Sequence, residues 1–152
     1  MDRDAILLTP GPLTTTLRTK LAMLRDWGSW DADFIAMTAE LRRRLLAVVH
    51  ADVDGNGAYA VVPLQGSGAF AVQEALATVV LPPEQGGHLL VLDNGAYCKR
   101  LGRLATLMGR RTTILGHAED EPVSADKLDA ALRTDPSISH VGFIHCETGT
   151  VC

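Results

Sequence analysis

The chain has 152 residues, enough for one domain, and its 14 Lys and Arg against 18 Asp and Glu give a net charge of −4. A negative net charge argues against general binding to nucleic acid, which requires an excess of basic residues. No apolar run is long enough to span a membrane, and the charged N-terminus is unlike a signal peptide. Cys98, Cys146 and Cys152 are too few for a disulfide framework. We therefore expect a cytoplasmic protein that binds neither nucleic acid nor membranes.

The first third of the chain predicts an arm followed by helices. Residues 6–13 are apolar and are interrupted by Pro10, Gly11 and Pro12, a pattern that predicts an ordered turn or an extended arm. The threonines at 14–16 offer N-caps for a short helix, and Asp31 precedes a longer helix with apolar residues at helical spacing. We expect residues 1–56 to form an N-terminal arm and helices.

The rest of the chain alternates between expected strands and helices. Helices are expected from Ala69, from Tyr97 and from Ser124 or Ala125, and strands at residues 59–64, 88–92, 112–115 and 141–146. Apolar strands separated by helices predict a mainly parallel sheet with helices on both faces, which is an α/β fold. Because the sequence stops just after the run 141–146, we expect residues 57–152 to be an incomplete domain of a longer chain.

Three loops are expected at the carboxyl edge of this sheet, where α/β proteins bind ligands. They are Gly66–Gly68, Asp93–Gly95 with Tyr97 just after it, and residues 145–148. In the first loop, glycines allow close approach, and a helix N-terminus favours an anion, commonly phosphate. We favour phosphate binding there over a turn that uses glycine for geometry alone.

The residues also leave other interpretations open. Gly66, Gly68 and Asp93 loosely match a dinucleotide fingerprint, so a Rossmann-like nucleotide-binding module is an alternative, although two helices precede the loop. Tyr97 suits either stacking on a planar ring or packing in the core. His145 and Cys146 are adjacent in an expected strand and point to opposite faces, so we expect no metal site.

Five motifs in one order together resemble a known family. They are Leu8-Thr-Pro-Gly-Pro-Leu13, Arg25-Asp-Trp-Gly-Ser-Trp-Asp31, Pro63-Leu-Gln-Gly-Ser-Gly68, Asn94-Gly-Ala-Tyr97 and His145-Cys-Glu-Thr148. The chain resembles the N-terminal part of the 2-aminoethylphosphonate–pyruvate transaminases, which are class V, fold-type I aminotransferases dependent on pyridoxal 5'-phosphate. The resemblance implies a partial PLP-transferase large domain. It also implies a dimeric enzyme that converts 2-aminoethylphosphonate and pyruvate to phosphonoacetaldehyde and alanine.

The resemblance also assigns site residues. Ser67, Gly68 and Ala69 would hold the cofactor phosphate, Tyr97 would stack on the pyridine ring, and Thr148 would approach the ring hydroxyl. The arm at Pro10, Gly11 and Pro12 would lie near the substrate. Gly149 stands where the family more often has threonine, which puts a contact at that position in question.

The same resemblance places the main catalytic groups outside this sequence. The lysine that holds the cofactor, the aspartate at its pyridine nitrogen and the arginine that grips the phosphonate would all follow Cys152. Lys20, Lys99 and Lys127 each lie in an expected helix, away from the strand ends. We therefore expect no catalytic residue within the chain and no transamination by the chain alone. A non-catalytic relic or partner-binding domain is a further alternative.

Overall fold

The computed structural model describes residues 5–9, 11–49, 59–118 and 121–149. Contacts divide the chain into two compact units, Met1–Gln65 and Gly66–Cys152. The expected boundary between residues 56 and 57 falls outside the described ranges and stays a prediction. Within those ranges, no helix is both long and apolar enough to cross a membrane.

The first unit contains the two helices that the sequence predicts. Helix α1 (Leu17–Ala22) begins after Thr16, whose side chain accepts a hydrogen bond from the Thr19 amide. Helix α2 (Ala32–Val48) begins after Asp31, as expected, although the Asp31 carboxylate binds the Gly28 amide rather than an amide of its own helix. None of the described residues in this unit is buried.

The strand expected at residues 59–64 is absent, so that prediction is wrong. Residues 59–65 form neither strand nor helix, and Tyr59, Val62 and Leu64 are exposed. A strand needs hydrogen-bonding partners on a neighbouring strand, and Pro63 has no amide hydrogen to donate. An apolar run therefore stays irregular where no partner strand lies beside it.

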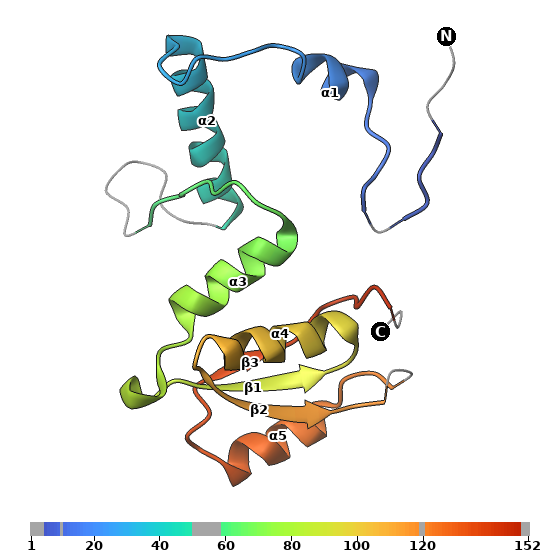
Figure 1. Cartoon of the computed structure of the whole chain (residues 1–152), viewed down its shortest axis with the longest axis vertical. Helices are drawn as coiled ribbons and strands as arrows, with labels where there is room; N and C mark the ends of the chain where they lie inside the picture. Colours follow the sequence, from blue (N-terminus) through green and yellow to red (C-terminus); the bar gives the residue numbers. More distant parts are fainter. Residues whose placement is uncertain (1–4, 10, 50–58, 119–120, 150–152) are drawn as a thin grey trace. The chain divides into compact units, whose positions relative to one another are not determined.

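The second unit contains the sheet and its helices (Figure 1). Its elements are α3 (Gly68–Val79), the short 3-10 helix η1 (Pro83–Gln85), β1 (His88–Asp93), α4 (Ala96–Leu107), β2 (Arg111–Gly116), α5 (Ala125–Thr134) and β3 (His140–Gly142). The strands lie in the order β2-β1-β3, and β1 pairs in parallel with both neighbours. The predicted parallel α/β sheet is confirmed.

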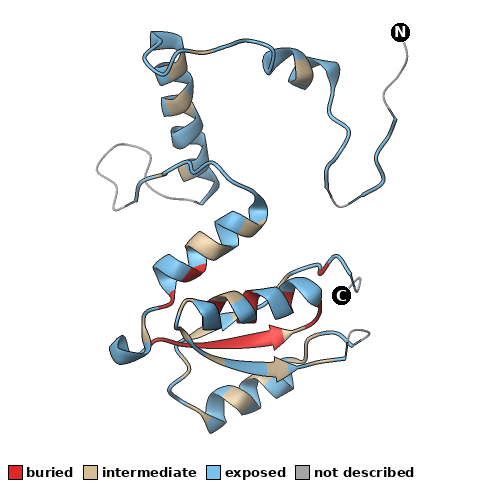
Figure 2. Ribbon diagram, in the orientation of Figure 1, coloured by how far each residue is buried: buried red, intermediate tan, exposed pale blue. Residues whose placement is uncertain are grey.

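The core lies around β1, which is buried along almost its whole length (Figure 2). Helices α4 and α5 cover opposite faces of the sheet (Figure 1). Side chains along a strand alternate between faces. Leu89 and Val91 accordingly belong to a cluster with Leu76 of α3 and Leu101 of α4, whereas Leu90 faces residues of α5. Burial of β1 on both faces explains its continuous run of apolar residues.

Strand β3 is shorter than expected. The sequence predicts a strand over residues 141–146, but the strand ends at Gly142. Cys146 has a φ of 57°, which lies in the left-handed region and is incompatible with a strand. Residues 143–149 therefore leave the sheet and form turns just beyond its edge.

Candidate functional site

The glycine-rich loop leads directly into the N-terminus of α3. Ser67 is the N-cap, and its hydroxyl accepts a hydrogen bond of 3.2 Å from the Phe70 amide. The amides of Gly68 and Ala69 are the first two of the helix, so no carbonyl within α3 accepts from them. A Cβ at Gly68 would meet nothing within 4 Å, so there is open space beside this residue. The donor set fits a phosphate group.

Gly66 has a different role from Gly68. A Cβ at Gly66 would overlap the ring of Phe70, so glycine is required there for local packing. The two interpretations of the loop therefore apply to different residues. Packing against Phe70 accounts for Gly66. That Ser67, Gly68 and Ala69 hold an anion stays a prediction.

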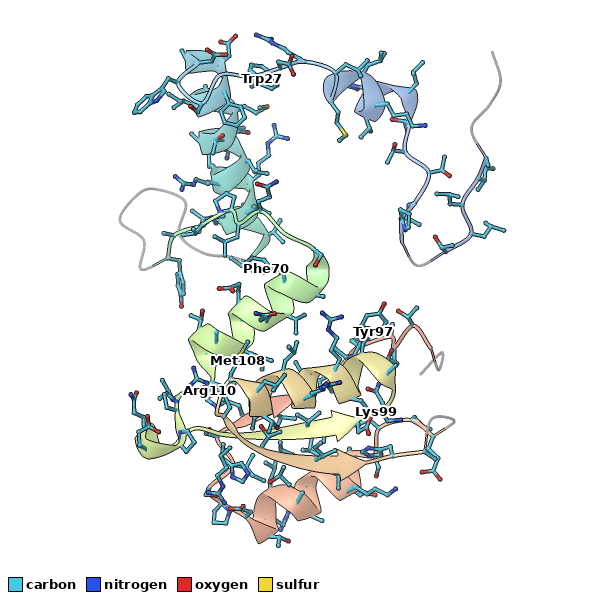
Figure 3. All side chains as sticks on the ribbon, viewed as in Figure 1. Trp27, Phe70, Tyr97, Lys99, Met108 and Arg110 are labelled. Atoms are coloured by element: carbon cyan, nitrogen blue, oxygen red, sulfur yellow. The ribbon has the colours of Figure 1, made fainter. Side chains whose placement is uncertain are left out.

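Tyr97 lies at the N-terminal end of α4 (Figure 3). It is 50% exposed in this chain. Tyr97 and Ala69 line the same cavity of about 40 Å³, which brings the start of α4 next to the start of α3. A cavity of this size holds about one water molecule.

Thr148 lies in the turn region after β3 and is exposed. The residue before it, Glu147, is 1% exposed, and its Oε2 accepts a hydrogen bond of 3.2 Å from the Cys98 amide. A second bond of 2.9 Å runs from the Asn94 side-chain amide to the Ile144 carbonyl. These bonds hold the loop of Thr148 beside the start of α4. Sequence reasoning missed this role of Glu147, because only the fold brings residues 98 and 147 together.

The proposed substrate arm lies in the first unit, and its distance from the loops of the second unit stays a prediction. Pro10 is outside the described residues. The Thr9 hydroxyl donates to the Pro12 carbonyl at 2.7 Å, and Thr14 joins the two ends of the arm through the Leu7 amide and the Ala5 carbonyl. The segment around Gly11 and Pro12 therefore forms an exposed turn.

The remaining candidate groups are the three lysines, possible metal ligands and Cys98. Lys20, Lys99 and Lys127 lie in α1, α4 and α5, as the sequence predicts. The described residues contain no cluster of three or more His, Cys, Asp or Glu side chains suited to a metal ion. The Cys98 thiol donates to the Leu92 carbonyl, and burial raises the pKa of that thiol, which keeps it protonated and unreactive.

The nucleotide-binding alternative loses its structural basis. A dinucleotide fingerprint joins a strand to a helix. Here the residues before Gly66, from 59 to 65, form no strand. Asp93 does end a strand, β1, but its carboxylate accepts from the Gly95 amide in its own turn.

Comparisons with known proteins identify close relatives. No protein-family profile matches the chain. It is 64% identical over 149 residues to 2-aminoethylphosphonate–pyruvate transaminase 2 of Polaromonas sp. (strain JS666), covering 98% of this chain and 38% of that protein. It is 55% identical over 150 residues to transaminase 1 of the same strain, covering 99% of this chain and 39% of that protein.

A solved structure supports the same relationship. The crystal structure of alanine–glyoxylate aminotransferase from Nostoc sp. matches with a TM-score of 0.77 at 25% identity, covering 99% of this chain and 38% of that protein. The fold is therefore that of part of an aminotransferase, and the chain spans less than two-fifths of the length of these relatives. The resemblance of the five motifs is confirmed: over nearly all of its residues, the chain is related to the 2-aminoethylphosphonate–pyruvate transaminases.

Proposed function

We propose that the complete protein containing this chain is a pyridoxal-phosphate-dependent transaminase. It transfers the amino group of 2-aminoethylphosphonate to pyruvate and releases phosphonoacetaldehyde and alanine. The observation that carries the proposal is the open anion site at Ser67–Ala69 beside the exposed Tyr97, in a chain 64% identical to a protein named for this reaction.

Each residue of the site has a defined task in this proposal. The Ser67 hydroxyl keeps one hydrogen to donate while it accepts from Phe70, and the Gly68 and Ala69 amides add two further donors for the phosphate. The face of Tyr97 supports the pyridine ring, and Thr148 approaches the ring hydroxyl. When bound, the cofactor supplies an electron sink that allows an amino group to move between substrates.

The chain provides only part of such a site. The described lysines lie in helices, and none lies at the ends of the strands. We propose that the cofactor lysine, its partner aspartate and the phosphonate-binding arginine belong to sequence beyond these 152 residues. On this basis the chain alone binds the cofactor weakly and does not transaminate. The complete enzyme is proposed to be a cytoplasmic homodimer, with Pro10, Gly11 and Pro12 near the substrate.

The first experiment is the intact mass of the natural gene product, followed by an assay for alanine formation from 2-aminoethylphosphonate and pyruvate. We expect a subunit more than twice 16.3 kDa that forms alanine when pyridoxal phosphate is present. The 152-residue chain by itself should form none. A full-length, folded product that binds the cofactor but forms no alanine would contradict the proposed reaction.

A pair of variants tests the phosphate site within the same enzyme. Ser67→Ala removes both the hydroxyl and the cap of α3, and we expect the dissociation constant for pyridoxal phosphate to rise about tenfold. Ser67→Thr keeps a hydroxyl at the same position and should bind within about threefold of the parent. Equal affinity in all three proteins would remove Ser67 from the site.

A further inference from the structure

The N-terminus of α4 differs from those of the other capped helices. In α1, α3 and α5, the side chain of the N-cap residue accepts from the amide of the third helical residue: Thr16 from Thr19, Ser67 from Phe70 and Ser124 from Lys127. The N-cap of α4 is Gly95, which has no side chain to do this. The corresponding amide of α4, that of Cys98, therefore needs an acceptor from elsewhere in the chain.

Glu147 supplies that acceptor from the loop after β3. Its Oε2 lies 3.2 Å from the Cys98 nitrogen, across 49 residues of sequence. The side chain is 1% exposed, and among the described residues its Oε1 is buried without a hydrogen-bond partner. Burying a carboxylate is costly. The helix dipole and the amide offset part of this cost, because both favour negative charge at a helix N-terminus.

This long-range cap adds a direct bond between two loops, which a local cap would not do. Tyr97 immediately precedes Cys98, and Thr148 immediately follows Glu147. The bond between Cys98 and Glu147 therefore fixes the start of α4, which carries Tyr97, to the loop that carries Thr148. The bond from Asn94 to the Ile144 carbonyl acts between the same two segments.

We propose that Glu147 is a positioning residue of the cofactor site. Its carboxylate holds Tyr97 and Thr148 in the mutual arrangement that the cofactor ring requires, without contacting the ring itself. This inference rests on the proposed function, since it takes pyridoxal phosphate as the ligand of both residues. The inference adds that cofactor binding requires an acceptor oxygen on the side chain at position 147, which neither Tyr97 nor Thr148 can replace.

The test uses the full-length gene product and three substitutions at one position. Glu147→Ala removes the acceptor, Glu147→Asp shortens the side chain by one methylene, and Glu147→Gln keeps an acceptor oxygen at full length. We expect the dissociation constant for pyridoxal phosphate, measured by titration of intrinsic fluorescence, to rise about tenfold in the Ala and Asp variants. The Gln variant should bind within about threefold of the parent.

A matched control separates positioning from general loss of stability. Ser124→Ala removes the equivalent bond at the third amide of α5, from Lys127, at a helix whose cap is not part of the proposed site. It should lower stability as Glu147→Ala does but leave the affinity for pyridoxal phosphate unchanged. Amide hydrogen exchange should become faster at Tyr97, Cys98 and Thr148 in Glu147→Ala and Glu147→Asp, and remain slow in Glu147→Gln.

The outcomes distinguish the inference from the function on which it rests. A parent protein that binds pyridoxal phosphate as tightly as its folded Ala and Asp variants overturns the role of Glu147 and leaves the proposed function standing. A parent that does not bind pyridoxal phosphate overturns both. If Glu147→Ala does not fold, the two other variants decide. Weak binding of pyridoxal phosphate by Glu147→Asp together with parent-like binding by Glu147→Gln supports the inference, and equal affinity of these two variants overturns it.

Discussion

Asp135 shows how a single carboxylate organises the amino end of the sheet. It follows α5 and accepts from both the hydroxyl and the amide of Ser137. Arg111 of β2 lies 3.4 Å away, and Nδ1 of the buried His88 lies 3.6 Å away. The two hydrogen bonds from Ser137, and then the charge of Arg111, hold the pKa of Asp135 below its usual value.

The direction of this shift sets a pH dependence of stability. A carboxylate whose pKa is lowered by folding stabilises the native state above its unfolded pKa, and this contribution is lost as pH falls through the lowered pKa. We therefore expect Asp135→Ala to be less stable than the parent at neutral pH, with the difference shrinking in strong acid. Urea unfolding over a pH series measures this difference.

Ser137→Ala serves as the companion variant for Asp135. It removes the hydroxyl donor, which is the largest cause of the lowered pKa, and should therefore weaken the pH dependence while the carboxylate remains. Parallel stability curves for the parent and Asp135→Ala across the whole acid range would show that the pairing contributes nothing.

At the scale of elements, a tight turn sets the entry of the chain into β1. Pro83–Gln85 form the 3-10 helix η1, and the Gly86 and Gly87 amides bind the Pro83 and Pro82 carbonyls. A Cβ at Gly87 would overlap the backbone carbonyl of Leu81. Because backbone atoms cannot move aside as a flexible side chain can, this turn requires glycine at position 87.

Gly87→Ala should therefore destabilise the protein by about 3 kcal/mol, the upper part of the usual range for overpacking. Gly116→Ala is the matched control, because a Cβ there meets nothing within 4 Å. Its cost should stay below about 1 kcal/mol, as is usual for a substitution that creates no clash. Chemical denaturation of the two variants and the parent gives both values. Equal effects of the two substitutions would mean that the turn relaxes to accept a side chain.

At the scale of the whole molecule, burial separates the two units. The buried apolar side chains of the described residues all lie in the second unit, in α3, α4, β1 and the residue that follows α3. In the first unit large apolar side chains such as Leu8 (93% exposed) and Trp30 (89% exposed) remain accessible. Since burial of apolar surface is the main stabilising term, the second unit should carry most of the stability of the chain.

Limited proteolysis tests this distribution in the intact 152-residue chain. Cleavage requires local opening of the backbone, so the first cuts should fall within residues 5–65. A fragment that begins close to Gly66 and contains β1, α4 and β2 should persist, as judged by mass spectrometry. First cuts within residues 88–116 would contradict the assignment of stability to the sheet.

Most helices could be predicted from residues close to their starts. Thr16, Ser67 and Ser124 cap α1, α3 and α5 with their own side chains, so the information for those starts lies within four residues. The strands were predicted less reliably than the helices. Strand β1 is apolar throughout because both faces are buried, but the similar run at 59–64 has no partner strand and forms none.

The candidate site divides in the same way. The cap of α3 by Ser67 could be predicted, because a glycine loop before a helix presents donors through local geometry alone, whereas anion binding there stays a prediction. Tyr97 was left between a stacking and a core role; it is 50% exposed in this chain, and its role stays a prediction. The capping role of Glu147 was not predicted, because its partner is 49 residues away and local sequence patterns do not indicate contacts at that separation.

The sequence by itself determined the α/β class, most helix starts and the relationship to the aminotransferases, since each depends on local chemistry or on motif order. Only the tertiary structure decided which apolar runs pair as strands, that β1 is central, and that Glu147 caps α4. These features depend on contacts between residues distant in sequence, and the free energy of such contacts arises only when the chain has folded.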